Sequence, residues 1–136
     1  MPFVLDSSAA LAWLLPDEDS TAVDFLADRL EHDYAVVPAI WSLEVGNALL
    51  VAQRRGRIKN QELARIAAAL AALPIEADPP AGPPGLFAIL NLAKQHGLTI
   101  YDASYVELAQ RRALALATLD TKIRQTCEAL KLALLP

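Results

Sequence analysis

Residues 3 to 15 read FVLDSSAALAWLL, and this stretch decides the fold class. Residues 3–5 are a short run of large apolar residues, typical of a buried strand, and residues 7–15 have the composition of a helix. Pro16 ends the predicted helix because proline has no backbone N–H with which to continue it. Asp6 lies where the strand changes into the helix. We therefore predict a strand followed directly by a helix, with one acid at the junction.

The same order of short strand and helix recurs along the chain. Apolar periodicity and capping residues, with Ser20 as one predicted N-cap, indicate further helices at about residues 20–32, 40–55, 60–73, 86–96, 102–112 and 121–130. Strands are predicted at residues 34–37 and 115–119, with shorter ones starting at Ile75 in the proline-rich loop 74–85 and covering residues 132–135. This order predicts an α/β fold with a mostly parallel central sheet covered on both faces. We expect one domain over residues 1–136.

The composition restricts the kinds of site that the chain can hold. The net charge is −4, so no overall basic field draws in nucleic acid or an anionic membrane. Hydrophobic residues make up 54% of the chain, but no apolar run is as long as a membrane span and no signal peptide opens it, so we expect a soluble, cytoplasmic protein. Cys127, His32 and His96 give no zinc-type spacing, and a bound metal must therefore be held by oxygen.

Three aspartates lie at or near the starts of predicted helices. Asp6 and Asp120 directly follow predicted strands, and Asp102 lies in the segment LTIYDASYVELA, residues 98–109. Each has a plain structural explanation, because aspartate is a favoured N-cap and Thr99 with Asp102 has the spacing of a capping box. However, ligands in open α/β sheets bind beyond the carboxyl ends of the strands. From the residues alone, both explanations stay open.

Glu44 is harder to explain by structure alone. The segment IWSLEVGNALLVA, residues 40–52, predicts a helix that is buried nearly all round, with Glu44 and Asn47 on one face. A buried glutamate normally needs a charged partner, and no basic residue lies on this helix before Arg54. The sequence therefore favours a functional role for Glu44 over a buried ion pair.

Four ionised carboxylates in one place would repel one another strongly. At about 4 Å each pair would repel by roughly 4 kcal/mol at an effective dielectric constant of about 20. Several such pairs would rival the whole stability of a domain, about 5 to 15 kcal/mol. Either the acids stay apart, or some of them stay protonated, or a divalent cation joins them. Magnesium and manganese prefer carboxylate and water oxygens.

Four segments of the chain together resemble a known family. In chain order they are LDSSAALAWLLPDE, SLEVGNAL, LTIYDASYVELA and ATLDTKIR. In order and spacing they resemble the motifs of PIN-domain proteins, and above all the VapC-type ribonuclease toxins of bacterial toxin–antitoxin pairs. The resemblance covers essentially the whole chain. It implies a compact three-layer α/β/α sandwich.

The resemblance also implies an activity and the residues that carry it. The acids that would bind Mg²⁺ or Mn²⁺ are Asp6, Glu44, Asp102 and Asp120. The hydroxyls of Ser8 and Thr118 match family positions that assist the site, and Asn47 matches a frequent polar position. The implied reaction is hydrolysis of RNA phosphodiester bonds by metal-activated water, leaving a 5′-phosphate and a 3′-hydroxyl. A homodimer and a cognate antitoxin are implied by the family alone.

Two groups of basic residues are candidates for contact with the RNA substrate. One group follows or flanks the acid-bearing segments, and we predict that it meets RNA phosphates; its members are Arg111, Arg112, Lys122 and Arg124. The other is QRRGRIK, residues 53–59. There the plainer explanation is that cations are favoured in the last turn of a helix, and RNA contact is the alternative.

Two other functions stay open at this point. An aspartate directly after the first strand is also typical of phosphatases that form an aspartyl-phosphate. Those enzymes usually carry a second acid two residues later, where this chain has Ser8. The chain could also be a non-catalytic, metal-binding module for protein interaction.

Overall fold

A sheet of four parallel strands forms the centre of the computed structural model, which describes residues 1–136. The strands are β1 (Phe3–Leu5), β2 (Ala35–Val37), β3 (Ile75–Ala77) and β4 (Leu116–Ala117). They lie in the order β3-β2-β1-β4, and every neighbouring pair is parallel. The predicted parallel sheet is thereby confirmed.

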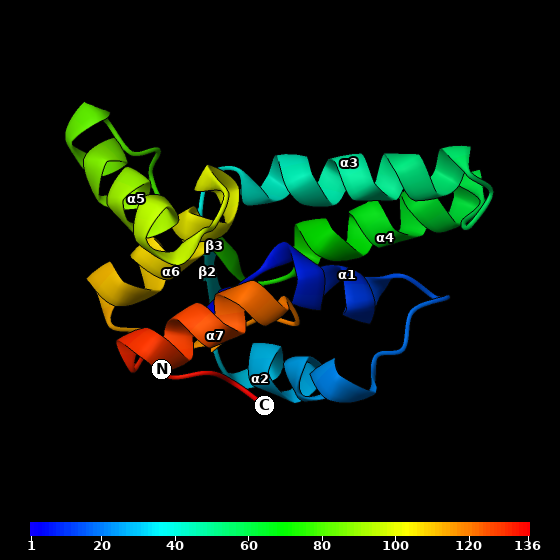
Figure 1. Cartoon of the computed structure of the whole chain (residues 1–136). Coiled ribbons are helices and arrows are strands. Elements are labelled where there is room, and N and C mark those ends of the chain that lie inside the picture. The colour runs from blue at the N-terminus through cyan, green and yellow to red at the C-terminus, as the bar shows by residue number, and fades with distance from the viewer.

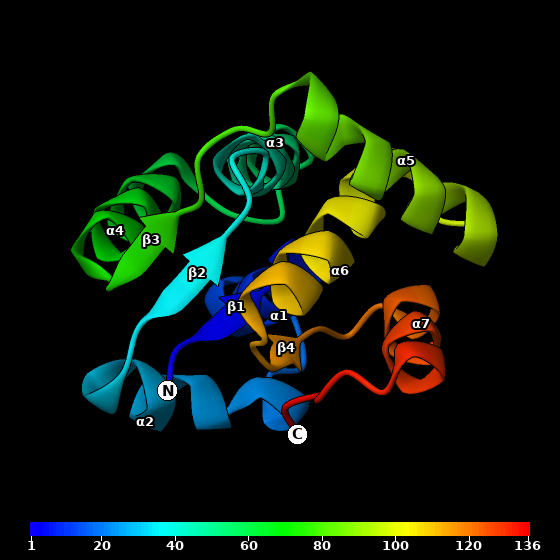
Figure 2. The same cartoon turned by 90° about the vertical axis from the view of Figure 1, so that its left-hand side faces the viewer.

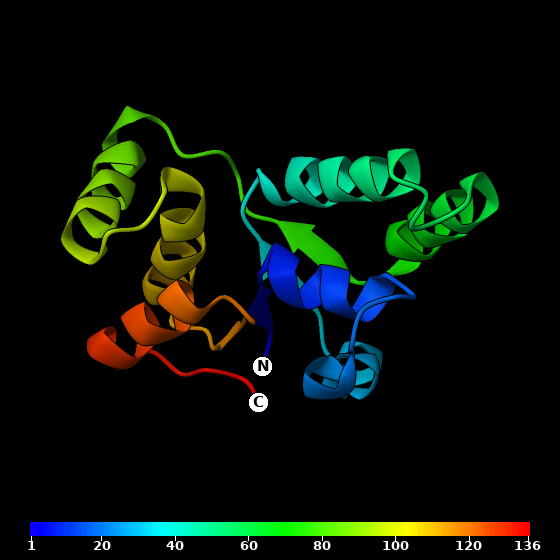
Figure 3. The same cartoon turned by 45° about the vertical axis from the view of Figure 1, so that its right-hand side comes forward.

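Helices cover both faces of this sheet, as the sequence predicts. They are α1 (Ser7–Leu14), α2 (Phe25–His32), α3 (Trp41–Arg54), α4 (Asn60–Ala72), α5 (Pro83–His96), α6 (Ile100–Arg112) and α7 (Thr121–Leu130). The first four lie on one side of the strands and the last three on the other (Figures 1 and 3). Figure 2 shows α6 against β1 and β4, with α5 and α7 beside it. None of these helices combines the length and apolar content that crossing a membrane requires.

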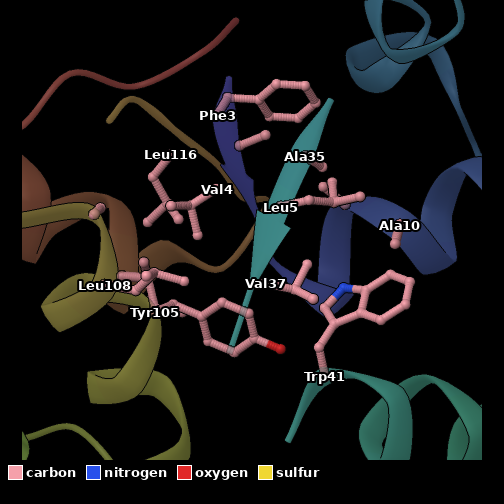
Figure 4. Close-up of a cluster of buried hydrophobic side chains, with 14 of the residues drawn as sticks. Phe3, Val4, Leu5, Ala10, Ala35, Val37, Trp41, Tyr105, Leu108 and Leu116 are labelled. Carbon is pink, nitrogen blue, oxygen red and sulfur yellow. The ribbon is translucent and has the colours of Figure 1, made fainter. Parts of the chain in front are cut away.

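The central strands are buried along their whole length because helices cover both faces. The residues of β1 and β2 are almost fully inaccessible, which explains why their sequences, FVL and AVV, are continuously apolar rather than alternating. Figure 4 shows Phe3, Leu5, Val37, Leu116 and Tyr105 packed around these strands. Burying such side chains is the main force that holds the three layers together.

Several predicted boundaries differ from the structure. The helix expected from Ser20 is divided into a 3₁₀ turn, Thr21–Val23, and α2, and the Ser20 hydroxyl donates to Asp24 instead of capping a helix. Helix α5 begins earlier than predicted, at Pro83, because proline fits the first turn of a helix. The strand expected at residues 132–135 is reduced to one parallel bridge between Leu134 and Leu116.

The prediction that α3 is buried nearly all round is wrong. Its buried positions form a single stripe, Trp41, Val45, Leu49 and Ala52. On another side of the helix, 69% of the surface of Leu43 is exposed. Glu44 lies between these two sides and is half-buried, so its carboxylate lies at the surface of the core.

Candidate active site

Four acids come to one part of the molecule, beyond the carboxyl ends of the central strands. Asp6 directly follows β1, and Asp120 lies just beyond β4. Glu44 lies in the first turn of α3, and Asp102 lies in the first turn of α6. The starts of α1, α3 and α6 gather between the two helical layers (Figure 3). All four acids therefore lie near helix N-termini, whose partial positive charge favours carboxylates.

Asp6 is buried, and it is not the side-chain cap of α1. Only 2% of its surface is exposed, and its carboxylate makes no capping bond to the helix. Its Oδ2 accepts hydrogen bonds from Ser8 Oγ at 2.5 Å and from Thr118 Oγ1 at 2.7 Å. Its Oδ1 has only a long contact, 3.5 Å, with Ser7 Oγ. Oδ2 is thus the oxygen more strongly engaged with the protein, and Oδ1 has only weaker contacts with Ser7.

The hydroxyls of Ser8 and Thr118 connect Asp6 to the turn that follows β4. Ser8 Oγ accepts the backbone N–H of Leu119 at 3.0 Å, and Thr118 Oγ1 accepts that of Asp120 at 3.0 Å. A hydroxyl that accepts an amide hydrogen can still donate its own hydrogen, and both donate to Asp6. The two hydroxyls predicted from the family resemblance therefore lie in one network with the first acid.

Asp120 and Asp102 take different parts in capping their helices. Asp120 is a true N-cap of α7, because its Oδ1 accepts the N–H of Ile123 at 2.9 Å. At α6 the cap is Thr99, whose hydroxyl accepts the N–H of Asp102 at 3.0 Å. The plain capping explanation is therefore correct for one oxygen of Asp120. The cap of α6 does not require the carboxylate of Asp102.

Glu44 has a neutral partner instead of a basic one. The hydroxyl of Tyr105 donates a hydrogen bond of 2.5 Å to Oε1 of Glu44. No lysine or arginine forms an ion pair with this glutamate, as the sequence of its helix predicts. Sequence reasoning missed Tyr105, although it lies one turn after Asp102 in the segment that carries the family motif. Asn47, one turn beyond Glu44, is exposed.

Burial and mutual repulsion raise the pKa values of three of the four acids. Burial is the main reason that the pKa of Asp6 is raised, and the charge of Asp120 adds to it. Burial likewise raises the pKa of Glu44, with smaller contributions from Asp6 and Asp102. The pKa of Asp102 is raised by burial and then by the charges of Asp120 and Asp6. Each carboxylate therefore acts on at least one other, and the four form one electrostatic cluster.

The chain matches the family model described as PIN domain over residues 3–129. It belongs to the PIN domain family. It is 30% identical over 134 residues to Ribonuclease VapC3 of Pyrobaculum aerophilum, an alignment that covers 96% of this chain and 98% of that relative. The resemblance to VapC-type PIN-domain proteins seen in the sequence is thereby confirmed.

Two solved structures share the fold of this PIN domain. PAE2754 of Pyrobaculum aerophilum superposes with a TM-score of 0.66 at 24% identity, covering 93% of this chain and 84% of that one. VapC20 of Mycobacterium tuberculosis, described as a Sarcin-Ricin loop cleaving toxin, superposes with a TM-score of 0.68 at 11% identity, covering 92% of this chain and 94% of that one. The predicted α/β/α fold is therefore confirmed.

The basic residues predicted to contact RNA fall into two groups in this PIN domain. Lys122 and Arg124 lie at the start of α7, beside the acids. The charge of Lys122 partly offsets the raised pKa of Asp102, and Arg124 donates to the carbonyl oxygen of Thr118 at 2.9 Å. Lys122 Nζ also donates to the carbonyl oxygen of Gly97 at 3.3 Å, so both cations contact backbone oxygens and neither forms an ion pair.

Arg111 and Arg112 lie at the other end of α6, and carboxylates already hold them. Arg111 contacts Asp78 at 2.6 Å and Glu107 at 2.7 Å. Arg112 contacts Asp78 at 3.7 Å and Glu76 at 3.8 Å. The structure therefore does not bring these two arginines together with the four acids.

In the 53–59 segment, Arg57 also has carboxylate partners. It pairs with Asp17 at 2.8 Å and with Glu18 at 2.9 Å. These contacts join the end of α3 to the loop after α1. Of this segment, Arg54 lies in the last turn of α3, as the plainer explanation requires. Arg57 lies beyond the helix and has a different structural role, which is this ion pairing.

A different group of residues has the tightest spacing of potential metal ligands. Asp28, Glu31 and His32 place one ligand atom each within 4.8 Å of one another. All three are exposed on α2, where residues three and four apart are neighbours by helical geometry alone. In that group the His32 ring already contacts Asp28, at 3.0 Å from its carbonyl oxygen. Helical spacing accounts for this group without a metal.

The chemistry of the four acids of the PIN domain fits a hard divalent cation. All their donor atoms are carboxylate oxygens, the kind of ligand that magnesium and manganese prefer. Burial and repulsion oppose the ionised forms of three of them, so a bound cation would relieve an unfavourable concentration of charge. The less engaged Oδ1 of Asp6 is the clearest position for a bond to such a cation.

Proposed function

We propose that this chain is a magnesium- or manganese-dependent ribonuclease that hydrolyses RNA phosphodiester bonds, and that it acts in the cytoplasm as the toxin of a toxin–antitoxin pair. The observation that carries the proposal is the electrostatic cluster of four acids in a chain of the PIN domain family. The name of the relative, Ribonuclease VapC3, supports the same reaction.

Each residue of the site has a part in this proposal. The cation would be held by Asp6, Glu44, Asp102 and Asp120. When bound, such a cation activates water as a nucleophile and offsets the charge that develops on the phosphate oxygens. Ser8 and Thr118 hold the carboxylate of Asp6 through Oδ2, and Oδ1 would then be available to the cation. No side-chain nucleophile is required.

Lys122 and Arg124 would bind the phosphates that flank the cleaved bond. Their position beside the acids supports this role, because cations there can draw in an RNA backbone that the acids alone would repel. Arg111 and Arg112 would first have to leave their carboxylate partners. We therefore propose that Lys122 and Arg124 contribute most to binding, and that reversing their charges reduces the dependence of RNA affinity on salt.

The decisive experiment measures RNA cleavage by the purified chain with Mn²⁺, with Mg²⁺ and with a chelator. Cleavage is expected with either metal and should disappear in the chelator. Asp102→Asn should abolish cleavage without unfolding the protein, because the cap of α6 is Thr99. Asp28→Asn is the matched control, since it changes the exposed group on α2, and it should leave cleavage unchanged.

Two results of this experiment would reject the proposed function. Cleavage that persists in the chelator would exclude a metal-dependent reaction. Cleavage by Asp102→Asn at the rate of the unmodified chain would show that the acidic cluster is not the site of the reaction.

The proposal includes two protein partners, a second copy of the chain and a cognate antitoxin. Exposed apolar side chains on one side of the molecule support the homodimer. On α5 they are Leu86, Phe87 and Leu90, with exposed fractions of 43%, 70% and 44%. Helix α5 and the exposed Leu43 of α3 line the same cavity, which has a volume of about 580 Å³. The antitoxin follows from the proposed role as a toxin.

A further inference from the structure

Glu44 lies on α3, and the one hydrogen bond to its carboxylate comes from a residue of another helix, α6. It lies next to the exposed Leu43, and it is itself only half-buried. A glutamate side chain has several rotatable bonds, and a half-buried one can turn toward the solvent. The rotamer freedom lost on fixing such a side chain costs up to about 2 kcal/mol, so a specific contact is needed to hold it.

That contact is the hydrogen bond from Tyr105. The ring of Tyr105 is fully buried, with 0% of the residue exposed, and the hydroxyl is the only polar atom of its side chain. Figure 4 shows the ring packed beside the central strands, with the hydroxyl directed away from α6 and toward the side where Trp41 begins α3. The hydroxyl reaches Oε1 of Glu44 at 2.5 Å. The buried, rigid Tyr105 therefore holds the flexible side chain of Glu44, which lies at the edge of the core.

Tyr105 also connects two of the acids through the backbone. It lies three residues after Asp102 on α6, so both side chains belong to one face of that helix. The hydrogen bond to Glu44 then sets the position of the carboxylate on α3 relative to the one on α6. We propose that Tyr105 is a positioning residue, which holds the carboxylate of Glu44 in the metal-binding arrangement; this inference rests on the metal site of the proposed function.

A neutral donor suits this position better than a cation does. A lysine or arginine in place of Tyr105 would cancel the charge of Glu44 and compete with a metal for it. A phenol occupies one oxygen, Oε1, and leaves the negative charge and Oε2 for a cation. Asp6 is held in a similar way, because two neutral hydroxyls donate hydrogen bonds to Oδ2 and neither of them donates to Oδ1. Hydrogen bonds of this kind commonly orient the ligands of protein-bound metals.

The test is a double-mutant cycle with Mn²⁺ as the probe, measured by calorimetry on the full chain. Tyr105→Phe removes the hydroxyl and keeps the buried ring, and it should weaken Mn²⁺ binding about tenfold. Glu44→Ala should weaken it further, and adding Tyr105→Phe to Glu44→Ala should then have a much smaller effect, because Glu44 accepts the hydrogen bond of the hydroxyl. Tyr34→Phe, on an exposed tyrosine at the opposite end of β2, is the matched control.

Three results would overturn the inference. They are unchanged Mn²⁺ affinity in Tyr105→Phe, an equal loss of affinity whether or not Glu44 is present, and no binding of Mn²⁺ by the unmodified chain. Thermal unfolding of each variant without metal distinguishes a loss of positioning from a loss of folding. If the unmodified chain binds Mn²⁺ and the cycle shows coupling, but no RNA is cleaved, then the ribonuclease proposal fails while the role of Tyr105 stands.

Discussion

At the scale of single residues, Asp6 has an unfavourable charge that its neighbours only partly offset. Two hydroxyls donate to its Oδ2, yet burial and Asp120 still raise its pKa. A folded protein tolerates such a group when function requires it, and replacing it then stabilises the fold. The free energy of unfolding of a variant without this charge therefore measures how much the charge destabilises the fold.

We predict that Asp6→Asn stabilises the metal-free protein by about 0.5 to 2 kcal/mol at neutral pH. The amide oxygen can replace Oδ2 as the acceptor of both hydroxyls, and the charge disappears. Urea unfolding in a chelator measures the effect. Asp33→Asn is the contrasting control, because the N-terminal amino group lowers the pKa of Asp33 and should make its charge favourable. A destabilised Asp6→Asn variant would contradict the argument.

Thr118 provides a second prediction at this scale. Thr118→Val keeps the shape of a buried side chain but removes the donor to Asp6 and the acceptor for the N–H of Asp120. We expect a destabilisation of about 1 to 3 kcal/mol and weaker Mn²⁺ binding. Thr126→Val is the matched control, because Thr126 is also buried and its hydroxyl bonds only to the carbonyl oxygen of Lys122. It should destabilise the protein and leave Mn²⁺ affinity unchanged.

At the scale of elements, four helices end in a left-handed residue, and only two of these residues are glycine: Gly97, and Gly56 with φ 74° after α3. Gly97 ends α5 with φ 66°, Ala113 ends α6 with φ 54°, and Lys131 ends α7 with φ 58°. A side chain makes this conformation unfavourable for residues other than glycine. The ends of α6 and α7 are therefore less favourable than the end of α5.

We predict opposite effects for two reciprocal substitutions at these ends. Ala113→Gly should stabilise the protein by about 0.5 to 1 kcal/mol, and Gly97→Ala should destabilise it by about 1 kcal/mol. A Cβ atom at Gly97 would meet no other atom within 4 Å, so the cost there is one of backbone conformation alone. Thermal unfolding of both variants measures the effects, and changes of the same sign would contradict this explanation.

The elements that the sequence predicted well are those with strong local signals. Residues 3–16 contain an apolar run, a helix and a terminating proline, and the structure has β1 and α1 there. The prediction of a strand at residues 132–135 was wrong, because strand pairing there depends on the distant Leu116 and not on the residues of the segment itself. Tyr105 was missed for the same reason, since its partner Glu44 lies 61 residues away in the chain. Asp6 and Asp120 were indicated by their places directly after predicted strands, and Glu44 by an apolar helix that offers it no basic partner. The grouping of the four acids into one site came from the family resemblance.

At the scale of the whole molecule, the acidic cluster determines how stability depends on pH. The pKa values of Asp6, Glu44 and Asp102 are raised in the folded state, so their ionisation opposes folding and their protonation favours it. Acids with lowered pKa values, such as Asp17 and Asp33, contribute stability that is lost only as the pH falls below their ordinary value of 3.8. The two groups of acids therefore act in different pH ranges.

We predict that in a chelator the protein becomes more stable as the pH falls from neutrality toward the ordinary carboxyl pKa values, 3.8 for aspartate and 4.5 for glutamate. His32 acts in the same direction, because its pKa is raised by Asp28 and its contribution is lost as the pH rises above its ordinary value of 6.5. His32→Gln removes that contribution, and the trend should persist. Saturating Mn²⁺ should reverse the trend, because the metal requires ionised ligands. A stability that falls over this range in the chelator would contradict the prediction.

The proposed dimer also belongs to this scale. Phe87→Asp places a charge among the exposed apolar residues of α5 and should shift the chain from dimer to monomer in sedimentation measurements. Ala68→Asp on the exposed side of α4 is the control, and it should leave the dimer unchanged. A monomeric unmodified chain would reject the dimer.

The parallel arrangement of the strands determines where the two chain ends lie, and therefore where a tag can be attached. Met1 precedes β1, and Leu134 bridges to the first residue of β4, so both chain ends emerge on the same side, away from the four acids (Figures 1 and 3). An affinity tag or a fluorescent fusion at the carboxyl terminus should therefore leave the acidic cluster unobstructed. A fusion at the amino terminus would remove the ion pair between the Met1 amino group and Asp33.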